Sequence, residues 1–170
     1  DIPKFCYFSK AALAALNYLN WTPDIVHCHD WQAALVPLYL RTSFKDTNVG
    51  RAGAVLTIHN LRFQGIYDRK TIQYWSDLPD YVFNKDCMTQ NWLDANMLKG
   101  GITYCNKLTT VSNTYAGEIQ TEEYGEGLEE HLRYHSSKIL GIVNGIDTDI
   151  WNPATDKLLA AQYDSQSVIK

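Results

Sequence analysis

Apolar residues near the start of the chain recur at spacings of three and four. They are Phe5, Phe8, Ala12, Leu16 and Leu19. This spacing lines one face of an α-helix. Asn20 and Pro23 follow the pattern, so we expect the helix to end there.

The rest of the chain alternates between short β-branched runs and helical patterns. The runs predict buried strands at 24–29, 52–58, 107–111 and 138–143, and the patterns predict helices at 31–41, 93–104, 114–121 and 127–134. Pro37 lies inside the second helix and predicts a kink. Ser112 or Asn113 can cap the helix that follows. A last helix is expected from Asp156.

The segment from 61 to 91 shows little periodicity and many aromatic residues. A loop of this length in a compact domain is usually functional, or it contains short helices. Elsewhere, strands that alternate with helices indicate right-handed crossovers. We therefore predict an α/β fold, a Rossmann-like parallel sheet with helices on both faces.

Composition narrows the possible functions. The chain has 170 residues and a net charge of −4, which fits one domain and gives no basic footprint for nucleic acid or an anionic membrane. No apolar run approaches the ~20 residues of a membrane span. The four cysteines include no C-x-x-C pair, so we expect a reducing compartment and no disulfides.

Polar and aromatic residues gather where predicted strands end. These positions are 29–31, 59–65 and 144–147. In an open parallel sheet, ligands bind beyond the carboxyl ends of the strands. Aromatic rings stack on sugars, and Asp, Asn, Gln and His bond to sugar hydroxyls. Trp31 is either a sugar platform or a core residue, and Asp30 can serve as an N-cap and a ligand together.

Other chemistries have weaker support. His27 and His29 point the same way on one strand, roughly 7 Å apart, and with Asp30 and His59 they could form a metal cluster. No third ligand is fixed by the sequence, and strand histidines are often only hydrogen-bonded, so we expect no metal. Gly125 and Gly127 follow no strand and do not form a dinucleotide fingerprint. No P-loop or G-x-S-x-G elbow is present.

The motifs resemble those of bacterial glycogen synthases and plant starch synthases. Residues 27–37 are similar to that family's H-x-H-D-W stretch, and residues 57–65 to its T-I-H-N-L-x-[FY]-Q-G signature. Further matches follow in order at 109–119, 125–128, 141–147 and 151–153. Asn113 departs from the family, which commonly has Pro there, and this touches only a cap.

The resemblance implies the GT-B architecture, in which two Rossmann-like domains face each other across a cleft. Residues 1–170 would be an incomplete N-terminal, acceptor-side domain. The opening strand with its Lys-x-Gly-Gly-Leu loop and the C-terminal nucleotide-sugar domain would be absent. The expected activity of the parent enzyme is retaining transfer of glucose from ADP-glucose to an α-1,4-glucan, with the fragment alone inactive.

The same resemblance implies roles for individual residues. His59 would lie nearest the transferred glucose, Asn144 would bond to glucose or acceptor, and Asp30 and Trp31 would contact the glucan. Asn60 and Gln64 would shape the loop beside the sugar and complete the substrate-binding set. No metal or other cofactor is implied. The implied compartment is the cytoplasm, or the plastid for a plant protein.

Two alternatives remain open. One is a sucrose- or sucrose-phosphate-synthase-like glycosyltransferase, and the other is a non-catalytic module that binds α-glucan. Exposed sheet edges also predict self-association of a truncated domain.

Overall fold

A computed structural model describes residues 1–89 and 91–167. Its centre is a four-stranded sheet in the order β1-β2-β5-β6, with every neighbouring pair parallel. The strands are β1 (Ile25–His29), β2 (Gly53–Ile58), β5 (Lys107–Thr110) and β6 (Ile139–Gly141). Each lies within a predicted strand, and the predicted α/β class with a parallel sheet is confirmed.

Helices connect the strands. They are α1 (Ile2–Tyr18), α2 (Leu35–Arg41), α3 (Arg69–Ser76), α4 (Met97–Tyr104), α5 (Asn113–Glu118) and α6 (Glu129–Tyr134), with short 3-10 segments at Trp31–Ala33, Val49–Arg51, Asp80–Val82 and Ser136–Lys138. The predicted first helix is confirmed. Ser112 caps α5, because its hydroxyl accepts a hydrogen bond from the Tyr115 backbone N–H at 2.9 Å. This settles the choice between the two caps.

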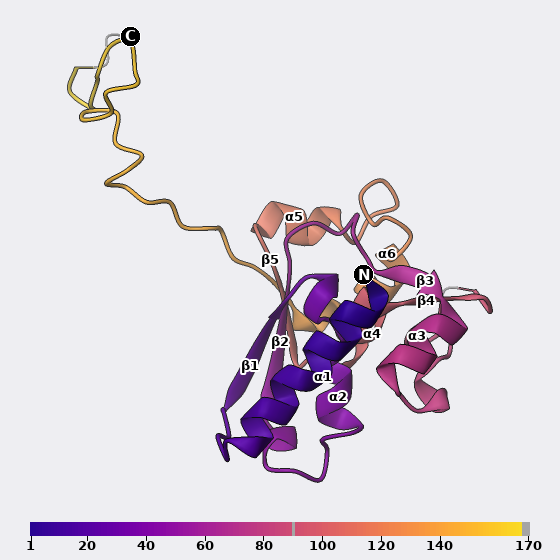
Figure 1. The fold of residues 1–170 in the computed structure, drawn as a ribbon. Coiled ribbons are helices and arrows are strands. Elements are labelled where there is room, and N and C mark those ends of the chain that lie inside the picture. Colours follow the sequence, from indigo (N-terminus) through magenta and orange to yellow (C-terminus); the bar gives the residue numbers. More distant parts are fainter. Residues whose placement is uncertain (90, 168–170) are drawn as a thin grey trace.

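The two faces of the sheet differ in cover. Cys28, Leu56 and Leu108 share one face by register and are at most 3% exposed. Figure 1 shows α1, α2 and α4 packed together beside this sheet. On the opposite face, Ile25 and Leu140 are about half exposed, at 55% and 51%. The helices of the described residues therefore bury one face of the sheet.

The second predicted helix is divided into two pieces. Residues Trp31–Ala33 form a 3-10 turn, and α2 begins at Leu35. Pro37 lies in the first turn of α2, where its missing N–H removes no intrahelical bond. The predicted kink at Pro37 is therefore wrong, and the break in the helix lies at Ala34.

The aromatic segment contains structure that its sequence pattern hides. Strand β3 (Ile66–Asp68) pairs antiparallel with β4 (Asp94–Asn96), and α3 follows β3 directly. The helix predicted at 93–104 is wrong in its first turn, because α4 begins only at Met97. Asn96 caps it, with its side-chain oxygen accepting from the Lys99 N–H at 2.9 Å. A three-residue strand is too short to show the alternation that identifies strands.

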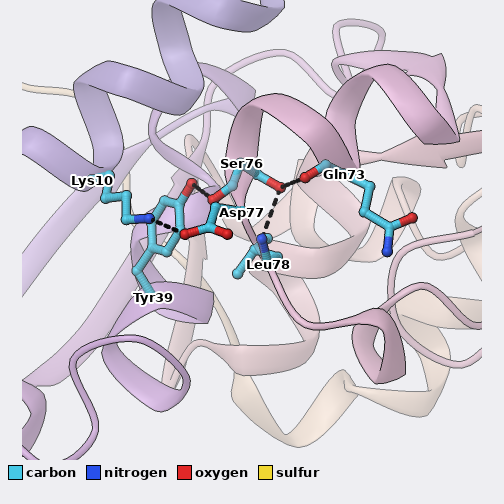
Figure 2. A network of polar contacts seen from close by, with 6 residues as sticks. All are labelled: Lys10, Tyr39, Gln73, Ser76, Asp77 and Leu78. Atoms are coloured by element: carbon cyan, nitrogen blue, oxygen red, sulfur yellow. Dashed lines mark hydrogen bonds and ion pairs between the residues drawn. The ribbon is translucent and has the colours of Figure 1, made fainter.

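Two polar contacts join the end of helix α3 to α1 and α2 (Figure 2). The buried Tyr39 hydroxyl of α2 donates to the Ser76 carbonyl at 2.8 Å. Lys10 of α1 forms an ion pair with Asp77 at 2.8 Å, just beyond the end of α3. Asp77 ends the helix in the left-handed region, with φ 54°.

The chain beyond β6 leaves the folded body. The chain after β6 runs away from the sheet and ends in a series of turns that includes 148–151 and 153–155 (Figure 1). The helix expected from Asp156 is absent from the residues described, which end at Ser167. All four cysteines are free and buried. No described helix is both long and apolar enough to cross a bilayer.

Candidate functional site

The carboxyl ends of β1 and β2 meet in a hydrogen-bonded corner. Parallel pairing continues one residue past β1, where the Asp30 N–H donates to the Thr57 carbonyl at 2.8 Å. The Asp30 carboxylate then accepts from the His59 backbone N–H at 2.8 Å. His29 Nδ1 lies 3.0 Å from His59 Nε2. The structure thus brings two of the three predicted corners together.

Asp30 has an unusual backbone. Its φ is 54° and its ψ −171°, a backbone region that residues other than glycine rarely adopt. This conformation turns the chain sharply between β1 and the 3-10 segment and directs the carboxylate toward His59. Oδ1 makes that contact, and within the described chain Oδ2 has no hydrogen bond. A carboxylate oxygen in this state can accept a sugar hydroxyl.

The ring of His29 lies between two other histidines. It stacks on His27 at 4.4 Å between centroids and tilts toward His59 at 5.2 Å. Burial lowers the pKa of His29, the charges of His27 and His59 lower it further, and Asp30 opposes them. The neutral form of His29 is therefore favoured at neutral pH.

Trp31 is half-buried and packs within the protein. Its ring meets Phe5 of α1 edge to face at 4.9 Å. Gly65 also lies against the indole, where an added Cβ would collide with the ring, and φ there is +65°. Glycine is required at 65 for both reasons. The motif glycine and the motif tryptophan are thus one packing unit, and contact of Trp31 with sugar stays a prediction.

The loop after β2 is held from several sides. The Asn60 side chain accepts from the Arg62 N–H at 3.0 Å and shapes the turn, while the residue itself stays exposed. Gln64 is 5% exposed. Its amide donates to the Glu126 carbonyl at 3.0 Å and accepts from Asn96 at 2.6 Å. Both ends of the Gln64 side chain are therefore engaged in supporting the loop.

Three supporting residues were not predicted from the sequence. The buried Asn96 bonds to Gln64, Tyr115 of α5 accepts from the Leu61 N–H at 3.1 Å, and Glu126 supplies a carbonyl. The N-cap position of Asn96 is a sequence signal, but the helix predicted from Leu93 obscured it. Tyr115 carries no local signal, because its contact spans 54 residues.

Asn144 lies at the same edge of the sheet but apart from this corner. Strand β6 is parallel to β1 and β2, and its end is two strands, roughly 10 Å, from β2. The Ile142 N–H still bonds to the Thr110 carbonyl at 2.7 Å. The chain then departs, and no hydrogen bond in the described residues joins Asn144 to Asp30, Trp31 or His59. Its substrate role stays a prediction.

No metal-binding group forms at the corner. Across residues 1–89 and 91–167, no three His, Cys, Asp or Glu side chains are placed to hold an ion. His27 instead bonds to the Thr57 hydroxyl at 2.7 Å. A cavity of about 860 Å³ lies elsewhere, lined by Lys99 and Thr103 of α4 and by His131 and His135 at α6. It belongs to no predicted site.

The fold is a Rossmann-like α/β domain, and polar side chains meet in a hydrogen-bonded corner at its strand ends. A sequence model described as the starch synthase catalytic domain matches residues 1–134. The chain belongs to the glycogen and starch synthase family, as its motifs predicted.

Individual relatives agree with this assignment. Glycogen synthase from Lachnospira eligens is 49% identical over 164 residues, which are 96% of this chain and 34% of that protein. Glycogen synthase from Thermotoga maritima is 47% identical over 159 residues, 93% of this chain and 32% of that protein. The chain therefore spans about a third of the length of the curated relatives it matches.

A solved structure matches the fold. It is the catalytic domain of starch synthase IV from Arabidopsis thaliana bound to ADP and acarbose, with a TM-score of 0.85 and 40% identity over 96% of this chain and 34% of that chain. The match confirms the α/β class, a parallel sheet with helices on both sides. The described residues supply the helices on the side of Cys28 and Leu56.

Proposed function

We propose that the chain is the acceptor-side part of a retaining glycosyltransferase that extends α-1,4-glucans with glucose from ADP-glucose. The observation that carries the proposal is the corner of His29, Asp30 and His59, in a chain of this family. A carboxylate and an imidazole beside each other suit a reacting sugar. In this proposal residues 1–170 are the later part of an N-terminal domain, and a C-terminal domain holds most of the nucleotide sugar.

His59 is placed beside the transferred glucose in this proposal. The bond from glucose C1 to the ADP oxygen breaks, and the acceptor hydroxyl attacks from the same face. The proton of that hydroxyl passes to the leaving phosphate. His59, through its imidazole and its carbonyl, stabilises the cationic, oxocarbenium-like centre that develops on C1. Positively charged groups outside this chain stabilise the diphosphate.

The remaining site residues act on the acceptor or on the loop. The free carboxylate oxygen of Asp30 accepts a glucan hydroxyl, and the exposed part of Trp31 contacts a sugar face. Asn60 and Gln64 hold the loop that carries His59. Asn144 reaches the sugar when its segment folds against the second domain. The relative from Arabidopsis, bound to ADP and acarbose, favours these ligand classes.

Location and self-association follow as proposals. The enzyme acts in the cytoplasm, where its bacterial relatives would meet ADP-glucose, or in the plastid for a plant protein. Residues 1–170 by themselves present β1 as an edge strand with Ile25 55% exposed. Such an edge favours self-association of the isolated chain.

The activity is tested with the full-length protein and residues 1–170 side by side. Each is incubated with ADP-glucose and a maltooligosaccharide, and ADP release is measured. We expect release by the full-length protein and none by residues 1–170. Glucan binding without release by either protein would support a non-catalytic module. Release with fructose in place of the maltooligosaccharide would support a sucrose-synthase-like enzyme.

A substitution tests the role of His59. We expect His59→Ala to lower kcat of the full-length protein about 100- to 1,000-fold, the usual cost of losing one group that stabilises a transition state. The thermal unfolding midpoint should change little, because the side chain is exposed. Near-normal turnover would remove His59 from the catalytic centre.

A further inference from the structure

His59 is held at two points by two consecutive residues, one at the end of β1 and one just beyond it. The Asp30 carboxylate accepts from its backbone N–H at 2.8 Å, and His29 Nδ1 lies 3.0 Å from its ring nitrogen Nε2. One contact fixes the main chain and the other fixes the side chain. An exposed imidazole with only a backbone contact would rotate about its χ angles.

The ring of His29 is itself supported from behind. It stacks on His27 with 29° between the ring planes. His27 Nε2 is 2.7 Å from the Thr57 hydroxyl, which is 2.6 Å from the Thr109 hydroxyl. This chain of contacts crosses β1, β2 and β5. His29 is therefore anchored through three strands, although its own ring is near solvent.

The contact between the two rings constrains their protons. A neutral imidazole has one N–H donor and one bare acceptor nitrogen. One of His29 Nδ1 and His59 Nε2 must donate, and the other must accept. A bond held in one direction leaves Nδ1 of His59 in one protonation state, bare if its Nε2 donates and protonated if its Nε2 accepts. A neutral imidazole free in water would populate both tautomers.

We propose that His29 is a positioning residue, whose Nδ1 fixes the ring orientation and the tautomer of His59 before the sugar arrives. The inference deepens the proposed function and rests on it for the role of His59. The pKa of His29, lowered first by burial, agrees with a neutral partner. If both rings were imidazolium, His29 Nδ1 and His59 Nε2 would each carry a proton and the hydrogen bond would be lost.

Three substitutions at position 29 separate the hydrogen bond from packing. The amide nitrogen of Asn occupies the position of imidazole Nδ1, whereas that of Gln reaches the position of Nε2. Phe keeps a ring that stacks on His27 but cannot form the hydrogen bond to His59. Asn and Gln form the matched pair, because they differ in reach and not in chemistry.

We expect His29→Phe and His29→Gln to lower kcat of the full-length protein about 10- to 100-fold, the usual cost of a misplaced group. KM for ADP-glucose and for the glucan should stay within about threefold. His29→Asn should keep kcat within about fivefold of that of the unsubstituted full-length protein. If His29→Phe fails to fold, the Asn and Gln pair decides.

A second measurement does not depend on turnover. Imidazole ¹⁵N resonances of His59 should report one tautomer in the parent protein and in His29→Asn. They should report a mixture in His29→Phe and His29→Gln. A purely structural role for His29 would leave the tautomer unchanged.

Several results would overturn the inference. These are near-normal kcat in both His29→Phe and His29→Gln, equal losses in the Asn and Gln variants, or a change confined to KM. An unchanged His59 tautomer in His29→Phe would overturn it as well. If the parent protein releases no ADP, the proposed function fails, and the tautomer measurement still decides whether His29 positions His59.

Discussion

At the scale of single residues, the packing of Trp31 against Gly65 explains why position 65 is a glycine. Trp31 and Gly65 lie 34 positions apart, yet a side chain at 65 would collide with the indole. The sequence places both near a ligand edge, but it cannot show that they touch. Of the predicted site residues, Asp30 and His59 do meet directly. His29 was predicted at this edge and as a possible metal ligand, but its contact with His59 was not predicted, because a hydrogen bond between residues 30 positions apart leaves no local pattern.

The first prediction concerns Trp31. We expect Trp31→Ala in the full-length protein to raise KM for the glucan about three- to tenfold more than KM for ADP-glucose, the size of one lost ring contact. Steady-state kinetics with each substrate varied in turn measure this difference.

Phe5→Ala is the matched control for Trp31. It removes the ring that packs against the indole and leaves the indole itself in place. We expect loss of stability in both variants, but a change in glucan KM only in Trp31→Ala. If Trp31→Ala changes stability alone, Trp31 is a core residue and the stacking hypothesis fails.

At the scale of elements, long patterns were predictable and short ones were not. Helix α1 has 17 residues and repeats its apolar spacing several times, so its pattern is unambiguous. Strands β3 and β4 have three residues each and are defined by pairing with each other. The helix break at Ala34 follows the turn at Asp30. The residues around Asp30 contain no glycine that would have predicted its positive φ.

The contact between α2 and α3 supplies a stability prediction. Tyr39 is fully buried, and burial raises its pKa strongly, so the hydroxyl remains a donor to Ser76. We expect Tyr39→Phe to lower the free energy of unfolding by about 1–2 kcal/mol, because a buried carbonyl loses its partner. Urea unfolding measures the change.

Lys10→Met serves as the comparison for Tyr39→Phe. It removes the ion pair with Asp77, whose side chain is 83% exposed. Exposed pairs contribute about 1 kcal/mol or less. A loss in Lys10→Met larger than that in Tyr39→Phe would mean that the charged contact, and not the buried hydroxyl, fastens α3.

At the scale of the whole molecule, we expect the free energy of unfolding to fall at acidic pH because of two histidines that line the cavity between α4 and α6. Burial lowers the pKa of His131 to about 4, with His135 and Lys99 adding to the effect. Burial also lowers the pKa of His135 to about 4, and Lys138 adds to it. Both imidazoles are therefore neutral in the folded protein at pH 7.

The sign of the pH dependence follows from linkage. The unfolded chain protonates these histidines near pH 6.5, and the folded chain only near pH 4, so the unfolded state binds more protons between these values. The stabilisation is complete above pH 6.5 and decreases as pH falls to 4. We expect the two histidines together to cost a few kcal/mol by pH 4, at about 1.4 kcal/mol per pKa unit and less where solvent reaches the ring.

Unfolding midpoints at pH 7, 6, 5 and 4 measure this loss. The double variant His131→Gln, His135→Gln should show a flatter profile over the same range, because glutamine does not titrate. An equal slope in the parent and the double variant would assign the acid sensitivity to other groups.

The order of the strands bears on how this part of the protein is made. Strand β2 pairs with β1, β5 with β2 and β6 with β5, so each strand joins one that precedes it in the chain. Synthesis delivers the N-terminal segments first. A nascent chain can therefore extend this sheet one strand at a time as it leaves the ribosome. No later strand has to be inserted between two strands that are already in the sheet.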